Sequence, residues 1–295
     1  MTHLARRAWQ ALEPCHAMVY FAPEPRVAFD LLGFKGYWMG YFASRSAAMG
    51  PVPAAVVTAT FYSFHPGMVA RAIPTAWSIA SPAQVLKARA ETAGSALRHL
   101  LAEAATSPEM EEAAALLRDA AAAMSPLGRP LFAGHAALGW PSEPHRALWH
   151  GATLLREHRG DGHVATLMTH GIDGCEANVL LVATGRAARA TVQPRRGWSD
   201  DEWAAATSRL TERGLLDKAG QLTGEGVRLH QDVEDRTDEL AMAPWRHLGA
   251  ERADRLLTLA EGFGRRIVVA GGVPADNPTG LPVSPGAARR GPGRW

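Results

Sequence analysis

The sequence predicts a mainly α-helical protein with one short two-stranded hairpin in its second half. Apolar residues recur every three to four positions along most of the chain, as at Leu4, Ala8, Leu12 and Cys15, which is the period of a helix with one buried face. Prolines and glycines divide these runs into many short segments. Because 47% of the 295 residues are apolar and 20% are charged, the chain can bury a sizeable core.

The first half is expected to form a helical, aromatic-rich domain over residues 1–140. A proline and three glutamates at the start of its last long helix are typical of a first helical turn. Residues 125–144 hold four prolines and three glycines and are the expected linker to the second half. Helices are expected over 3–21, 83–105 and 108–124, with shorter helical segments over 26–50 and between Pro66 and Pro74.

The second half, residues 141–283, is expected to be another helical domain, followed by a disordered tail over 284–295. Asp173 and Ser199 occupy favoured N-cap positions, and Glu202 completes a capping box with Ser199. Helices are expected over 144–158, 163–170, 174–184, 199–216, 224–241 and 249–266, with an irregular basic loop over 186–198.

The two halves share a pattern that leaves two interpretations open. Each begins with an aromatic helix, one from Trp9 to Tyr20 and the other from Trp149 to His158, and continues through short helices. The halves are either a degenerate internal duplication or two all-α segments of similar composition.

A short two-stranded wing is expected near 215–223. Gly214 allows a left-handed stop after the preceding helix, leucines at both ends can anchor the two arms, and Thr223 can cap the next helix. The string over 210–240 resembles the wing region of MarR-like winged helices, where an RGL turn, two short strands and an LT..G helix start follow in order. This resemblance implies a winged-helix-like C-terminal half.

The charge pattern argues against DNA binding. A formal net charge of +2 provides no field that would gather nucleic acid. Residues 160–185, which cover the expected recognition helix, contain Asp161, Asp173 and Glu176 but no lysine or arginine, whereas phosphate contacts require cations. The arginines of the basic loop are better explained as solvated side chains than as an anion site.

Four segments carry a second resemblance. They are EPCHAMVYF at 13–21, LWHGATLLREHRGDGH at 148–163, QPRRGWSDDEW at 193–203 and RGLLDKAGQLT at 213–223. Through these the chain resembles an actinobacterial family of helix-turn-helix-like proteins described as SalK-like. The resemblance implies an association with actinobacterial metabolism but supplies no catalytic residues.

The densest polar group lies over 150–163, where Arg-Gly-Asp-Gly is expected to break a helix and Asp161 to cap the next one. Side chains and free N–H groups at such a break can converge on an anion; the alternative is a salt-bridged surface turn. Histidine titrates near neutrality, so His150 and His163 are the candidate catalytic residues. The candidate ligand-binding residues are His16, Tyr20, Arg156, Glu157, Arg159 and Asp161.

Glu13, His16 and Tyr20 share one helical face through spacings of three and four. The Glu-x-x-His pattern occurs in di-iron bundles, but those need a second copy and two more glutamates, and the sequence has no second copy. No metal site is therefore predicted, and a buried His16 bonded to Glu13 is the simpler interpretation. The aromatic and methionine residues of 37–68 form either a pocket wall or core.

Function follows from these features only in outline. Phosphate loops, zinc spacings, a GxSxG elbow and a dinucleotide fingerprint are all missing from the sequence, so no cofactor is predicted. We expect a small-molecule-binding protein, with enzymatic activity left open, whose pocket lies between the halves. A transcription regulator and a non-catalytic scaffold are the alternatives. A cytoplasmic protein without a membrane span is expected, and a homodimer is left open.

Overall fold

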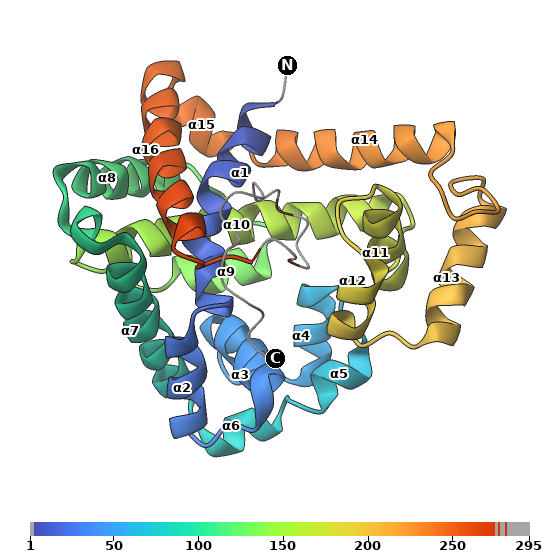
Figure 1. Cartoon of the computed structure of the whole chain (residues 1–295), viewed down its shortest axis with the longest axis horizontal. Helices are drawn as coiled ribbons and strands as arrows, with labels where there is room; N and C mark the ends of the chain where they lie inside the picture. The colour runs from blue at the N-terminus through green and yellow to red at the C-terminus, as the bar shows by residue number, and fades with distance from the viewer. Residues whose placement is uncertain (1–2, 275–276, 278–280, 282–295) are drawn as a thin grey trace.

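The computed structural model describes residues 3–274, 277 and 281, and these residues fold almost entirely into helices (Figure 1). The predicted mainly α-helical fold is therefore confirmed, whereas the expected disordered tail lies outside the described residues. The α-helices of the first part are α1 (Leu4–Ala17), α2 (Pro23–Leu31), α3 (Gly36–Ser46), α4 (Ala54–Phe61), α5 (Pro66–Ala70), α6 (Thr75–Ile79), α7 (Pro82–Leu101), α8 (Pro108–Ala122) and α9 (Pro130–Ala136). Those of the second are α10 (Pro144–Thr169), α11 (Gly174–Ala183), α12 (Arg189–Arg196), α13 (Asp200–Glu212), α14 (Gly224–Leu240), α15 (Ala243–Leu248) and α16 (Ala250–Val269), and the 3₁₀ helices are η1 (Met18–Tyr20), η2 (Ala47–Met49) and η3 (Ala102–Thr106).

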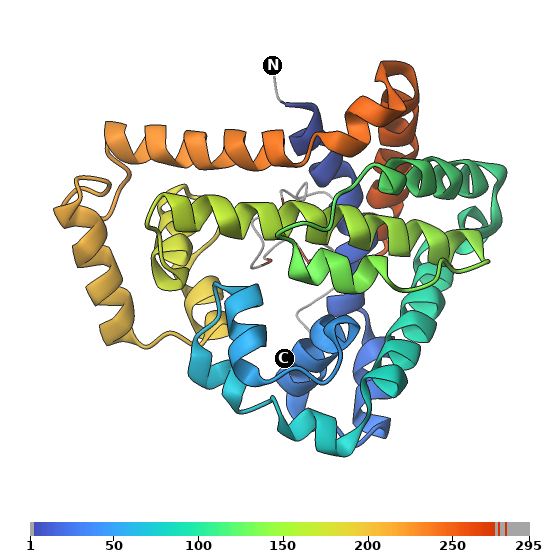
Figure 2. The ribbon, with the colours of Figure 1, turned by 180° about the vertical axis from the view of Figure 1, so that it is seen from behind.

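Helix α10 is the axis of the molecule. It crosses the whole structure in both opposite views, with α14 running alongside it and α1 crossing it (Figure 1, Figure 2). The expected break at Arg-Gly-Asp-Gly is wrong, because α10 continues through it to Thr169. A glycine inside a helix costs up to about 1 kcal/mol, but here glycines permit close packing. A Cβ at Gly151 would lie 2.7 Å from Leu117, and one at Gly162 would lie 2.7 Å from Arg129.

Three hydrophobic clusters hold the helices together. The first joins α1, α7, α8, α10, α15 and α16, so helices from both ends of the chain share one core. The second is formed by α2 to α7 with one residue of α9, and the third by the end of α10 with α11 to α14. The division into domains at residue 140 and the internal duplication stay predictions.

The predicted two-stranded wing is wrong. No strand is formed anywhere in the described part of the chain, and the segment holds only an isolated antiparallel bridge between Leu216 and Leu222. Gly214, with φ +72°, ends the preceding helix just before the bridge, and Thr223 caps α14 just after it. The Asp217 carboxylate accepts the backbone N–H groups of Ala219 and Gln221. The two arms therefore have no residues left to extend a ladder.

Two segments expected to be irregular are helical. The linker over 125–144 contains α9, because Pro130 suits a first helical turn and the next two side chains are buried. The basic loop contains α12, which ends where Gly197 takes φ +80°. The capping boxes led by Asp173 and Ser199 are confirmed at the starts of α11 and α13. Across the described residues, the helices are either too short or too polar to cross a membrane.

The loop between α4 and α5 is tied to the second half. Tyr62 has a φ of +46°, which is rare for a residue with a side chain, and its hydroxyl donates to the Ile172 carbonyl at 2.5 Å. The Ser63 carbonyl accepts hydrogen bonds from Asn178 on α11 and from Trp198. These bonds offset the strain and fix the distance between the aromatic helices and α11.

Replacing Gly174 by alanine tests this junction. The added Cβ would lie 2.1 Å from the Tyr62 carbonyl oxygen, so either α11 or the strained loop must move. We expect the free energy of unfolding, measured by denaturant titration, to fall by about 1–3 kcal/mol. Gly262→Ala in α16 is the matched control, since nothing lies within 4 Å of its added Cβ and stability should stay equal or rise. Equal stability of both variants would contradict the close contact.

Candidate functional site

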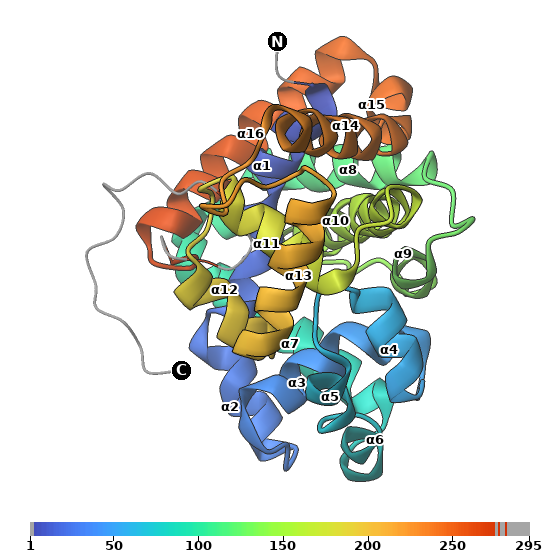
Figure 3. The same cartoon turned by 90° about the vertical axis from the view of Figure 1, so that its right-hand side faces the viewer.

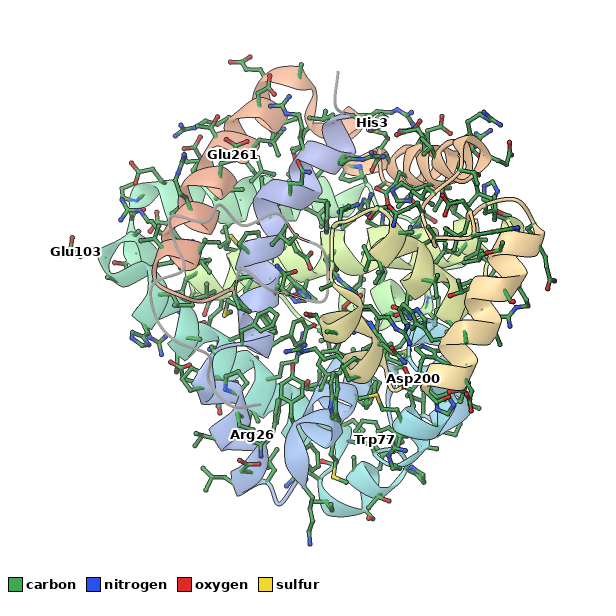
Figure 4. The ribbon with its side chains drawn as sticks, turned by 45° about the vertical axis from the view of Figure 1, so that its right-hand side comes forward. His3, Arg26, Trp77, Glu103, Asp200 and Glu261 are labelled. Atoms are coloured by element: carbon green, nitrogen blue, oxygen red, sulfur yellow. The ribbon has the colours of Figure 1, made fainter. Side chains whose placement is uncertain are left out.

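A cavity of about 570 Å³ lies between α1, α3, α10, α11, α12 and α14. Figure 3 shows α11 to α13 placed between α14 and the α3–α5 segment, where they close one side of this region. The volume falls in the range of small-molecule sites, about 300–1,000 Å³. Charged groups such as Glu103 point outward from the bundle (Figure 4), whereas several charges at the cavity are buried.

Aromatic side chains form one wall of the cavity. All four tyrosines of the chain line it, together with Trp9, Trp38, Phe61 and Phe64. The rings pack against one another, with centroids 5.2 Å apart for Tyr20 and Tyr41 and 5.6 Å apart for Tyr41 and Phe64. Several of these rings also belong to the second hydrophobic cluster. The two interpretations of the 37–68 segment, pocket wall and core, therefore both describe this wall.

A buried ion cluster stands at the middle of α10. The Glu157 carboxylate is 1% exposed and accepts from Arg45 on α3 at 3.1 Å and from the neighbouring Arg156. Burial by itself would raise the pKa of Glu157, but the two guanidinium groups outweigh it and hold the pKa far below its usual range. Arg45 also lies 4.3 Å from the Phe61 ring centre. This cluster fastens the aromatic wall to α10.

Glu13 on α1 is a second buried acid in the wall, and it is unlike Glu157. Its Oε2 atom has no hydrogen-bond partner in the described structure. Burial raises its pKa, which favours the neutral carboxyl group. The expected bond between His16 and Glu13 is replaced by bonds from His16 to Thr153 and Tyr20. Among the residues that are described, no group of three histidine, cysteine or acidic side chains could hold a metal ion.

The α14 side of the cavity carries Arg159 and His163. Arg159 binds Asp238 at 2.9 Å and lies 3.5 Å from Glu234. Thr237 donates its only hydroxyl hydrogen to a backbone carbonyl at 2.7 Å, so at the 3.0 Å contact the Nδ1 atom of His163 must be the donor. The Nε2 atom of His163 is therefore the unprotonated nitrogen. Burial lowers the pKa of His163 to about 4, which keeps the ring neutral.

Asp161 does not cap a following helix, because α10 is unbroken there. Its carboxylate instead accepts the backbone N–H of Phe132 at 2.9 Å, near the start of α9. Burial raises the pKa of Asp161 to about 6. Asp161 lies in the cavity wall, close to the Glu157 cluster. It does so as part of a continuous helix and not as the helix cap that the sequence predicted.

Most of the predicted site residues come together. Tyr20, Arg156, Glu157, Arg159, Asp161 and His163 all line the cavity. His16 is fully buried behind Tyr20, and His150 packs edge-on against Trp140 at 4.9 Å, neither of them in the cavity wall. The surface-turn alternative for 150–163 is wrong, since Glu157 and Asp161 are buried.

Sequence reasoning missed four arginines of the wall, among them Arg186 of the loop that was expected to be irregular. Arg195 and Arg196, expected to be solvated, lie on α12 against the cavity, and Arg196 is 4.4 Å from the Phe64 ring centre. Arg45 was not predicted to belong to the site, although it is the one charged residue of an aromatic helix and lies four residues after Tyr41. An isolated arginine at that spacing was the available signal, because arginine commonly stacks on aromatic faces.

Changing Glu157 to glutamine tests the ion cluster. The amide keeps the shape but removes the negative charge, leaving Arg45 and Arg156 without it. We expect the free energy of unfolding to fall by about 3–5 kcal/mol. Glu239→Gln breaks a solvent-exposed pair with Arg236 and should cost less than about 1 kcal/mol. Similar losses in the two variants would show that the cluster does not hold the fold.

A family model described as the helix-turn-helix family matches residues 5–274. No curated protein and no solved structure matches the chain. The match agrees with the predicted helix-turn-helix relationship, while the SalK-like and MarR-like resemblances stay predictions. Since the match spans nearly all of the described structure, the chain belongs to this helix-turn-helix family.

Proposed function

We propose that this protein binds a small, flat, anionic molecule in the cavity between α3, α10 and α12. The observation that carries the proposal is the excess of arginine beside an aromatic wall. The cavity is lined by Arg45, Arg156, Arg159, Arg186, Arg195 and Arg196, against the acids Glu13, Glu157, Asp161 and Glu234. Planar guanidinium groups suit carboxylate and phosphate ligands, and aromatic faces suit flat apolar ones.

The charge balance of the cavity favours a bound anion more strongly than the numbers of arginines and acids alone suggest. Burial raises the pKa of Glu13, which favours its neutral form. Burial raises the pKa of Asp161 to about 6, so Asp161 stays mostly ionised at neutral pH. The negative charges of Glu157 and Glu234 already face arginines of the wall. A bound anion would add the negative charge that a desolvated, arginine-rich cavity needs.

In this proposal Arg156, Arg159 and Tyr20 contact the ligand, and His163 offers an unprotonated Nε2 to it. Glu157 positions Arg156, and His16 positions Tyr20. His150, which packs elsewhere, has no part in the site. Whether a reaction follows binding depends on the ligand. A role in metabolism would agree with the SalK-like resemblance, and a homodimer remains compatible with the proposal.

A DNA-binding regulator is the second candidate, because the chain belongs to a helix-turn-helix family. The charge of the relevant helices opposes it. Helix α11 has no lysine or arginine and is covered by α13 and the α4–α5 loop. Helix α13 directly precedes the turn that was predicted to be a wing, and it exposes Asp200, Asp201 and Glu212. Its Arg209 is paired with Asp173. Neither helix presents the cationic face that phosphate contacts require.

Anilinonaphthalene sulfonate, a flat aromatic anion, is a suitable probe of the cavity. We expect it to bind the folded protein and to raise its melting temperature, because a ligand of the native state stabilises that state. Arg159→Ala and His163→Ala should each weaken binding at least about tenfold, corresponding to about 1.4 kcal/mol. Arg228→Ala, at an exposed pair on α14, is the matched control and should leave the affinity unchanged. Wild-type affinity in both cavity variants, folded by circular dichroism, would refute the site.

DNA binding is tested by fluorescence anisotropy with random duplex at physiological salt. We expect a dissociation constant weaker than the usual non-specific range of about 10⁻⁴–10⁻⁶ M, because the exposed face of α13 is acidic. Tight binding with a steep salt dependence would instead support the regulator. Loss of such binding on changing Arg195 and Arg196 together would assign it to α12.

A further inference from the structure

Arg89 on α7 is a buried cation without a carboxylate partner. It is 1% exposed, and within the described residues no acid lies at ion-pair distance from it. Its guanidinium donates to the Ser44 hydroxyl at 3.3 Å and to the Tyr20 hydroxyl at 3.0 Å. It also lies near the ring faces of Tyr20 and Trp149. Desolvating a cation in this way is costly unless negative charge comes close to it.

The hydrogen-bond chain around Tyr20 fixes the position of each proton. Thr153 donates its only hydroxyl hydrogen to the Trp149 carbonyl at 2.8 Å. The Nδ1 atom of His16, 3.0 Å from Thr153 Oγ1, must therefore be the donor in that contact. The Nε2 atom of the neutral ring then lacks a hydrogen, so the Tyr20 hydroxyl, 3.1 Å away, donates to it.

Tyr20 thus connects the cavity to a buried base. Its side chain lines the cavity, its hydroxyl hydrogen points to His16, and its oxygen accepts from Arg89. A phenol oxygen that donates once and accepts once retains one more acceptor position. We propose that Tyr20 takes the proton of a ligand hydroxyl, of the phenol or enol class, and passes its own proton to His16. This rests on the proposed function and specifies the ligand as a weak acid bound as its oxyanion.

The proton transfer balances without any further reagent. The ligand O–H bond breaks as a new O–H bond forms on Tyr20, while the original Tyr20 hydrogen moves to His16 Nε2. The products are a ligand oxyanion and a His16 imidazolium, and Tyr20 stays neutral. Arg89 and the cavity arginines would face the oxyanion. Burial lowers the pKa of His16, and the charge of Glu157 partly offsets this and favours the imidazolium.

Burial keeps both members of this relay neutral. Burial lowers the pKa of His16 well below its usual value and raises that of Tyr20. Both shifts favour the uncharged forms in the empty cavity. The charged and titratable groups near the pair come from α3 and α7 as well as α10, and are Arg45, Tyr41, Arg89, Arg156 and Glu157.

The test uses para-nitrophenol, a phenol whose anion absorbs visible light, with the full chain. We expect the apparent pKa of the bound probe to fall by about one unit or more, a tenfold change in its ionisation constant. Tyr20→Phe keeps the ring, and His16→Gln keeps hydrogen-bonding groups that cannot take up the proton. Both should bind the probe without this shift. His99→Gln makes the same change at a solvent-exposed histidine outside the cavity wall and should retain the lowered pKa.

The outcomes distinguish a failure of the proton relay from a failure of ligand binding in the cavity. A bound probe with an unshifted pKa in the wild-type protein overturns the relay and leaves the binding cavity standing. A shift that persists in Tyr20→Phe or His16→Gln does the same. If His16→Gln fails to fold, Tyr20→Phe alone decides, since it removes one atom from a packed ring. Failure of both para-nitrophenol and anilinonaphthalene sulfonate to bind overturns the proposed function, and the relay with it.

Discussion

The structure depends on burying charge in the middle of its longest helix. Glu157 lies near the centre of α10 with Arg45 on one side and Arg156 beside it; Glu157 and Arg45 are buried, and Arg156 is half-buried. Such a cluster is tolerated only when every charge has a close partner. That requirement fixes α3 against α10, and α3 carries the aromatic wall. The same helix meets α14 through Arg159 and Asp238, so one element positions both sides of the cavity.

Membership of a helix-turn-helix family is compatible with an internal cavity in this fold. The α11–α13 segment supplies a wall of the cavity through α11 and α12, and some of its polar groups bind other residues of the chain. Glu176, for instance, caps α11 and pairs with Arg209 rather than meeting a partner outside the chain. Membership of the family therefore describes the arrangement of helices, while the side chains determine what is bound.

Sequence patterns predicted the positions of helix caps well. The caps at Asp173 and Ser199 begin helices where expected, because each satisfies a backbone N–H group that has no partner within its helix. A helix break at Gly160 and Gly162 was predicted from the same local rules, and this prediction was wrong. Packing against Arg129 and α14 outweighs the intrinsic cost of those glycines. The prediction of a wing was also wrong, because the motif match did not show how few residues remain between α13 and α14 for strand pairing.

The candidate site was predictable where its residues are close in sequence and not where they meet across the fold. The polar group of α10 stood out as a cluster, and most of it lines the cavity. Arg45 and Arg89 are isolated in the sequence, and their roles come from contacts with helices far along the chain. Pairings of that kind depend on the tertiary arrangement, which neither period nor spacing encodes.

The buried ion cluster also affects how the protein responds to heat. The free energy of hydrating charged groups becomes less favourable as temperature rises, so keeping Glu157, Arg45 and Arg156 away from water costs less in a warm solution. Apolar stabilisation per unit area reaches a plateau over the same range. On warming, the ion cluster at the centre of α10 should therefore contribute a growing share of the stability relative to the aliphatic clusters around it.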